Sequence, residues 1–292
     1  DEGVPEPFLA APPSGIDEII GNRRQRIGFA SPDVGAAIAI AVLGGWMCAV
    51  SAPGRNATSI GGTLLLVLAG WVISLCLHEF GHAVTAFRFG DRNAELRGYL
   101  TLNPMRYTHP GLSLGLPLLI ILLGGIGFPG GAVYLDERGM TNRQKTLVSL
   151  AGPAMNILLA AILLFVIRIA APDAYIPLHS GLMSGMILAV DGINLWAALA
   201  MLAFLQITAA VLNLIPMPGF DGYNAIEPYL SQQTRANAAK IAPYGFLIVF
   251  ALLFIPQLNA AFFDLIRWLF ELSGVPSNLA NQGWNVFMFW RT

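Results

Sequence analysis

Charged residues are scarce in this chain. They make up 11% of its 292 residues, whereas a soluble domain carries roughly a quarter. Hydrophobic residues account for 55%, and the mean hydropathy is +0.64. This composition argues against an ordinary soluble protein and indicates a polytopic membrane protein.

Cysteine and net charge are equally limited. Cys48 and Cys76 both lie in apolar runs, and neither belongs to a C-x-x-C pair, so we expect inert buried thiols rather than a thiolate metal site. The net charge of −1 gives no indication of nucleic-acid binding.

Long apolar runs occupy most of the chain, and about 20 apolar residues cross the hydrocarbon core of a bilayer. Four runs have that length: 34–52, 59–87, 146–171 and 193–215. The run at 244–272 is interrupted by Pro256 and could be one kinked span or a short hairpin. We therefore expect an all-α polytopic membrane protein, a bundle of about five to six transmembrane helices.

The segment 111–128 is apolar but rich in residues that break helices. Basic residues flank it on both sides, Arg106 before it and Arg138 after it, which indicates that both ends face one compartment. We predict a re-entrant segment rather than a crossing. The breakers are Gly111, Gly115, Pro117, Gly124, Gly125 and Gly127.

Polar and apolar residues alternate along 96–102, which is the period of a strand. A second short candidate is 132–135. We expect a small β-hairpin near the candidate active site at residues 78–82, with an irregular loop as the alternative. Its first strand offers an edge to which an extended substrate could add. That predicted substrate strand comprises Arg97, Gly98, Tyr99, Leu100, Thr101, Leu102 and Asn103.

The positions of the long apolar runs divide the chain into three regions. Residues 1–33 are polar and proline-rich, and we expect a tail without a cleavable signal peptide. Residues 34–272 would form the membrane-embedded domain, with its core at 59–222. Residues 273–292 would form a C-terminal tail.

The basic residues also predict an orientation. With a cytoplasmic N-terminus, only Arg55 and Arg168 lie outside, while Arg267 and Arg291 stay unassigned. Such asymmetry follows the positive-inside rule and puts the active-site side in the cytoplasm. The inside set is Arg23, Arg24, Arg26, Arg88, Arg92, Arg97, Arg106, Arg138, Arg143, Lys145, Arg235 and Lys240.

The motif H-E-x-x-H, formed by His78, Glu79 and His82, interrupts the second apolar run. Positions i and i+4 share one face of a helix, so both imidazoles can bind one metal ion. Glu79 lies beside that face, as suits a general base acting on a metal-bound water. Ionisable groups within a span are costly and mark function, which disfavours a pair of surface histidines.

Two histidines leave a catalytic zinc ion one protein ligand short. Asp221 is the best candidate for the third, because Pro216, Pro218 and Gly219 break the returning span just before it. Alternatively, Asp221 only forms a turn before Gly222.

Three motifs resemble the signatures of the site-2 protease family of intramembrane zinc metalloproteases. They begin at His78, Ala151 and Asn213 and read H-E-F-G-H, A-G-P-A-M-N and N-L-I-P-M-P-G-F-D-G. The resemblance implies that His78, His82 and Asp221 bind Zn²⁺ and that Glu79 is the catalytic base.

The resemblance further implies that Asn156 and Asn213 hold the substrate backbone or the developing oxyanion. Packing between helices is the alternative role for these amides. The loop after the third long run is too short for a PDZ domain, so we expect a branch without PDZ or nucleotide-binding domains.

We therefore expect a zinc-dependent intramembrane endopeptidase that cleaves transmembrane or membrane-proximal segments of other membrane proteins. Its partners would be those substrates and membrane lipid, without nucleic acid. The alternatives are a non-catalytic membrane adaptor with a structural metal site and a zinc transporter. A structural site needs no base and usually has four protein ligands, and a transporter would need further metal-binding residues along a path.

The re-entrant prediction can be tested by labelling. Cysteines that replace Arg106 and Arg138 should react with an impermeant maleimide from the same side of sealed vesicles, because the segment between them does not cross. Labelling from opposite sides would show that 111–128 spans the membrane.

Overall fold

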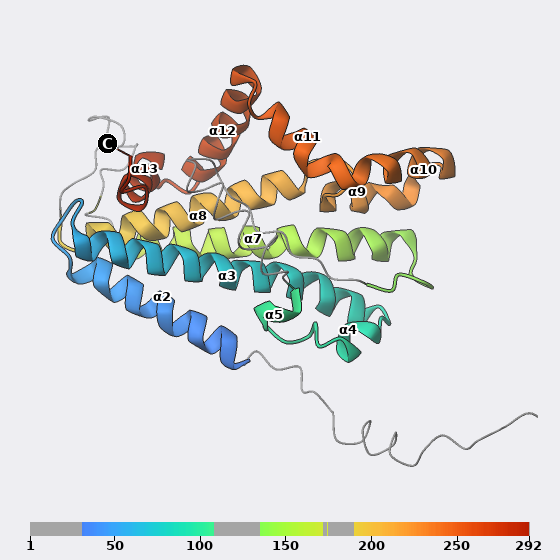
Figure 1. Ribbon diagram of the computed structural model, residues 1–292, viewed down its shortest axis with the longest axis horizontal. Helices are drawn as coiled ribbons and strands as arrows, with labels where there is room; N and C mark the ends of the chain where they lie inside the picture. Colours follow the sequence, from blue (N-terminus) through green and yellow to red (C-terminus); the bar gives the residue numbers. More distant parts are fainter. Residues whose placement is uncertain (1–30, 108–134, 172–173, 175–189, 292) are drawn as a thin grey trace, which may run out of the picture.

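The computed structural model describes residues 31–107, 135–171, 174 and 190–291 (Figure 1). These residues form helices joined by turns. The predicted re-entrant segment 111–128 and most of the predicted tail 1–33 lie outside the described residues.

Helices α2 (Pro32–Val50) and α3 (Ala57–Arg88) lie side by side and are joined by a short loop. The Ser31 side chain caps the start of α2, and Asn56 forms a capping box with Ser59 at the start of α3. Such caps satisfy backbone N–H groups that have no partner within the helix. The Asn56 cap therefore fixes where α3 begins after the loop, and the Ser31 cap fixes the start of α2 at the other end of that helix.

Helices α7 (Asn142–Ala170) and α8 (Ile193–Asn213) complete a bundle of four long helices. Helix α8 is the most enclosed of the four, because 67% of its apolar 18-residue stretch is buried inside the bundle. Its small residues pack against α7 and α12 in one cluster and against α3 in another. All four are long and apolar enough to cross a membrane, which confirms the helical membrane bundle.

After α8 the chain forms α9 (Asp221–Ile226), α10 (Gln232–Ile241), α11 (Gly245–Leu252) and α12 (Pro256–Glu271). Two 3₁₀ turns, Glu227–Tyr229 and Ala242–Tyr244, separate the first three of these. The pair formed by Gln232–Leu252 and Pro256–Glu271 is bent by 93° at Pro256. The candidate spans number four among the described residues, or five if the bent pair is one span.

The predicted strand at 97–103 is absent. Residues 97–100 form turns after the short helix α4 (Asn93–Leu96), and α5 (Pro104–Tyr107) follows. The N–H groups of Gly98 and Tyr99 donate to Glu95 and Ala94 carbonyls, so they are not available to a ladder. Of the second candidate, 132–135, only Leu135 is described, and it is not in a strand.

The alternation of polar and apolar residues along 96–102 led to a wrong prediction of a strand, because its apolar residues do not lie on one face of a sheet. Tyr99, Leu100 and Leu102 are all buried, and they pack against Phe80 and Ala83 of α3. The segment is thus a compact cover on the second half of α3.

Residues 273–292 contain a packed helix, α13 (Ser277–Phe287), where the sequence suggested a tail. Its Leu279, Val286 and Phe287 are buried. Gly283 lies so close to α8 that a Cβ there would be 2.3 Å from the Ala197 carbonyl oxygen. Helix α13 closes the end of the bundle where α2 and α3 are joined (Figure 1).

The α2–α3 contact generates a stability prediction. A Cβ at Gly62 would lie 2.8 Å from the Gly44 carbonyl oxygen and 2.9 Å from the Cys48 nitrogen. Gly62→Leu should lower the melting temperature of the detergent-purified protein by several degrees, since overpacking costs about 1–3 kcal/mol. Gly35→Ala is the control, because nothing lies within 4 Å of its Cβ. Equal melting temperatures would contradict the close crossing.

Candidate metal centre

Helix α3 places His78 and His82 on one face, one turn apart, as the i and i+4 spacing predicts. Both imidazoles are buried, with exposures of 8% and 6%. Their Nε2 atoms lie 3.2 Å apart. Two nitrogen donors thus face the same point inside the bundle.

Asp221 reaches that point from a tightly folded loop between α8 and α9. Gly219 has φ +101°, a backbone conformation that glycine adopts easily. A Cβ at Gly222 would lie 2.2 Å from the Leu214 carbonyl oxygen, so the loop turns back onto the end of α8. Phe220 is buried between Leu212 and Val249, which fixes the residue just before Asp221.

The three donor atoms form a nearly equilateral triangle. The Asp221 Oδ2 atom lies 3.2 Å from His78 Nε2 and 3.4 Å from His82 Nε2. Nitrogen and oxygen ligands about 2.0–2.1 Å from a tetrahedral zinc ion would lie roughly 3.3 Å apart. Asp221 Oδ2 is also buried without a hydrogen-bond partner. The cluster therefore has the spacing and the unsatisfied oxygen of a zinc site.

Hydrogen bonds at Nδ1 orient both imidazoles. His82 Nδ1 lies 2.7 Å from the Val148 carbonyl oxygen, which can only accept, so Nδ1 carries the proton and donates. Its Nε2 lone pair is then free to bind a metal. Such bonds from a histidine to a protein acceptor fix the tautomer and raise ligand basicity.

Asn156 performs the same task for His78, whose Nδ1 donates to Asn156 Oδ1 at 2.6 Å. The Asn156 Nδ2 atom donates to Gln206 Oε1 at 2.8 Å and to Ser74 Oγ at 3.2 Å, and Ser74 donates to Gln206. This network joins α3, α7 and α8 inside the apolar bundle. Neither Ser74 nor Gln206 was assigned to the site from the sequence, although a polar side chain in mid-span was the available signal.

Close approach of α3 and α7 explains two glycines of the motifs. A Cβ at Gly152 would lie 2.2 Å from His82 Nε2 and 2.7 Å from His78 Nε2. A Cβ at Gly81 would lie 2.8 Å from the Ala151 carbonyl oxygen. The backbone of α7 thus forms one wall of the site, at a distance that only glycine permits.

The remaining predicted site residues are placed as follows. Glu79 follows His78 on α3 and is 4% exposed. Asn213 is the last residue of α8 and partly buried, before the loop that carries Asp221. Residues 97–103 cover the outer side of α3, where Tyr99 and Leu100 pack on Phe80.

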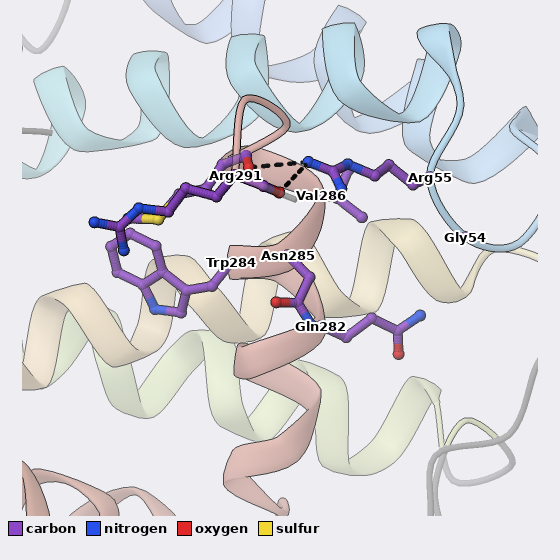
Figure 2. Close-up of a pocket in the computed structure, with 8 residues that line it drawn as sticks. Gly54, Arg55, Gln282, Trp284, Asn285, Val286 and Arg291 are labelled. Atoms are coloured by element: carbon purple, nitrogen blue, oxygen red, sulfur yellow. Dashed lines mark hydrogen bonds between the residues drawn. The ribbon is translucent and has the colours of Figure 1, made fainter. Parts of the chain in front are cut away.

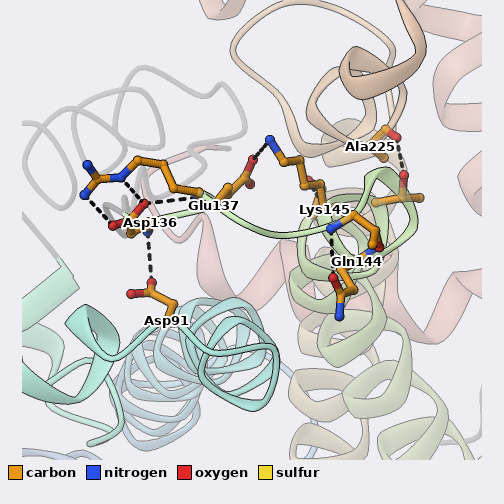
Figure 3. A network of polar contacts seen from close by, with 10 residues as sticks. Asp91, Asp136, Glu137, Gln144, Lys145 and Ala225 are labelled. Atoms are coloured by element: carbon orange, nitrogen blue, oxygen red, sulfur yellow. Dashed lines mark hydrogen bonds and ion pairs between the residues drawn. The ribbon is translucent and has the colours of Figure 1, made fainter.

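Polar contacts connect α3, the helix that carries His78 and His82, to its neighbours at this end of the bundle (Figure 3). The buried Asp91, just after α3, accepts from the Asp136 N–H at 3.0 Å. Hydrogen bonds from Arg138 lower the pKa of Asp136 to about 2, so its carboxylate stays ionised at neutral pH. Thr146 donates to the Ala225 carbonyl at 2.7 Å, which holds α7 against α9. The supports of His78, His82 and Asp221 are thereby linked.

A buried His–His–Asp cluster beside a glutamate, enclosed by membrane-length helices, is the arrangement of an intramembrane metalloprotease. Comparison with known proteins agrees. Residues 66–256 match peptidase family M50. No solved structure shows a significant match.

Three relatives illustrate the similarity. The "Putative zinc metalloprotease Rip2" of Mycolicibacterium smegmatis is 51% identical over 253 residues, 87% of this chain and 91% of the relative. The Mycobacterium tuberculosis H37Rv protein of the same name is 49% identical, over 78% of this chain and 82% of that protein. The "Putative zinc metalloprotease YwhC" of Bacillus subtilis is 31% identical, over 65% and 80%.

The chain belongs to peptidase family M50, the site-2 protease family. It is an integral membrane zinc metalloendopeptidase, and its cofactor is Zn²⁺. The resemblance carried by its three motifs is thereby confirmed.

The wall formed by Gly152 yields a prediction about metal binding. Gly152→Ala should reduce zinc per purified protein to a small fraction of the wild-type content, because the added methyl group occupies the space between the two Nε2 atoms. Gly45→Ala is the control, since the nearest neighbour of its Cβ is 3.6 Å away. Wild-type zinc content in Gly152→Ala would show that α7 does not border the metal position.

Proposed function

We propose that His78, His82 and Asp221 bind the catalytic zinc ion and that Glu79 is the general base. The convergence of two Nε2 atoms and one buried, unpartnered carboxylate oxygen carries this proposal. Three protein ligands leave one coordination position open, as a catalytic zinc site requires.

A zinc ion held there supplies Lewis acidity, which polarises a peptide carbonyl and makes water more acidic. The chain's own residues would do the rest. The Glu79 carboxylate accepts a proton from the attacking water as the new C–O bond forms. Glu79 then donates that proton to the amine nitrogen as the C–N bond breaks.

The proposed substrates are transmembrane or membrane-proximal segments of other membrane proteins. From the start of α3 at Ala57, His78 lies roughly 31 Å along the axis at about 1.5 Å per residue, near the far boundary of a core about 30 Å thick. A helical substrate hides its carbonyls in hydrogen bonds, so it must unwind there. Asn213, beside the Asp221 loop, is proposed to bind the unwound backbone or the oxyanion.

Asn156 is proposed to act differently from the initial prediction. Its oxygen accepts from His78 and its amide nitrogen donates to Ser74 and Gln206, so its hydrogen-bonding groups already have protein partners. We therefore assign it the positioning of His78 rather than contact with substrate.

The active-site side and the N-terminus are proposed to be cytoplasmic. The support is the distribution of Arg and Lys, which gather at the end of α3 that carries Arg88. The proposed orientation and the proposed substrate class do not depend on each other.

The proposed roles of Glu79 and Asp221 differ in their expected effect on zinc. Glu79→Gln should retain zinc and lose cleavage of a helical membrane substrate, because the base is removed and the ligands remain. Asp221→Ala should lose both. The measurements are zinc per purified protein and cleavage in proteoliposomes. Full zinc occupancy with activity in Asp221→Ala would refute the ligand assignment.

Two further variants sharpen this experiment. Glu95→Ala, a carboxylate on α4, should leave zinc and cleavage close to wild type. Asn156→Leu should weaken zinc affinity by about 10–100-fold, the usual effect of removing a hydrogen-bond partner from a metal-binding histidine. Unchanged affinity in Asn156→Leu would remove its positioning role without affecting the assignment of Glu79.

A further inference from the structure

Helix α11 lies against the loop that carries Asp221. Gly245 and Val249, one turn apart, are the two buried residues of this helix. A Cβ at Gly245 would lie 1.8 Å from the Pro218 carbonyl oxygen, so no side chain fits between the helix and the loop. Val249 belongs to one apolar cluster with Phe220. The inner face of α11 thus contacts the loop directly before Asp221.

The residues beside that face extend the contact. A Cβ at Gly219 would lie 3.0 Å from the carbonyl oxygen of Ala242, in the 3₁₀ turn that precedes α11. The Phe246 ring stacks on the Phe220 ring, with centroids 6.5 Å apart and an interplanar angle of 24°. Three consecutive loop residues, 218–220, therefore lie against the segment 242–249.

Asp221 depends on such packing more than His78 and His82 do. Hydrogen bonds at Nδ1 orient both imidazoles. The Asp221 Oδ2 atom is buried and accepts no hydrogen bond from the described residues. No donor fixes this oxygen, so its position beside the two Nε2 atoms is set by the backbone that carries it.

Different helices hold that backbone from two sides. On one side Gly222 lies against the end of α8, where its Cβ would be 2.2 Å from the Leu214 carbonyl oxygen. On the other side α11 covers residues 218–220. Helix α11 directs other side chains outward, and Leu247 is 65% exposed. It is thus a surface helix whose inner face packs on the loop of a predicted ligand.

We propose that Gly245 and Val249 are positioning residues, which hold Asp221 at the metal position by packing α11 against its loop. This inference rests on the proposed role of Asp221 as a zinc ligand. Because the two histidines belong to α3, displacing α11 moves the carboxylate relative to them and opens the triangle of donor atoms. Zinc affinity then depends on a helix that contains no ligand.

The test measures the zinc affinity of the full chain in detergent, by competition with a chromogenic chelator. Gly245→Ala should weaken zinc affinity about 10–100-fold, the usual loss when the support of a metal ligand is removed. Val249→Ala should weaken it about tenfold, and it carries the test if Gly245→Ala fails to fold. Leu247→Ala, on the outward side of α11, is the matched control and should bind zinc like wild type.

A second control separates positioning from a general loss of stability. Arg55 donates to the carbonyl oxygens of Met288 and Arg291, just after α13 (Figure 2). Arg55→Gln should lower the melting temperature and leave zinc affinity unchanged, because these bonds lie at the end of the bundle where α2 and α3 are joined. The visible spectrum of bound Co²⁺ should change in Val249→Ala and not in Arg55→Gln, since only the first variant moves a ligand.

Asp221→Ala separates the ligand assignment from the role of α11. If it loses zinc while Gly245→Ala and Val249→Ala keep wild-type affinity, the ligand assignment stands and the positioning role is overturned. If Asp221→Ala retains zinc, the ligand assignment fails and this inference fails with it. A loss of affinity in Arg55→Gln equal to that in Val249→Ala would also overturn the positioning role, since it would show a general effect of stability.

Discussion

The structure depends on one electrostatic constraint, that polar groups inside an apolar bundle need partners. Each imidazole has one nitrogen bonded to the protein and one directed at Asp221. The carboxylate oxygen between them has no hydrogen-bond donor. Zn²⁺, the cofactor of this family, would satisfy all three groups at once if bound there as proposed, and its binding would then be coupled to the packing of α3, α7 and the α8–α9 loop.

The long helices and the histidine pair could be predicted because membrane-spanning helices have a recognisable sequence pattern. Runs of about 20 apolar residues gave the four long helices, and the i, i+4 spacing gave the histidine face. Asp221 was predicted as a ligand from its place after a proline-broken span, and the structure brings its carboxylate next to both histidines. These inferences need only local periodicity and the cost of burying charge, and neither depends on knowing how distant segments meet.

What the sequence could not supply were contacts between elements. The alternation at 97–103 has the period of a strand, yet Tyr99, Leu100 and Leu102 are all buried against α3. Helix α13 was overlooked because it is short and mixed in composition, although it packs on α8. The family resemblance implied that Asn156 contacts the substrate, and nothing local revealed that its amide nitrogen would donate to Ser74 and Gln206.

The glycine at position 152 has a consequence for how such sites can diverge. The ligand positions are constrained by chemistry, and chemistry allows histidine, aspartate, glutamate or cysteine. Position 152 is constrained by volume, since even one methyl group would lie 2.2 Å from His82 Nε2, a proposed ligand atom. An inactive descendant of this protein could therefore arise from a glycine-to-alanine change alone, with every motif histidine and acid still in place.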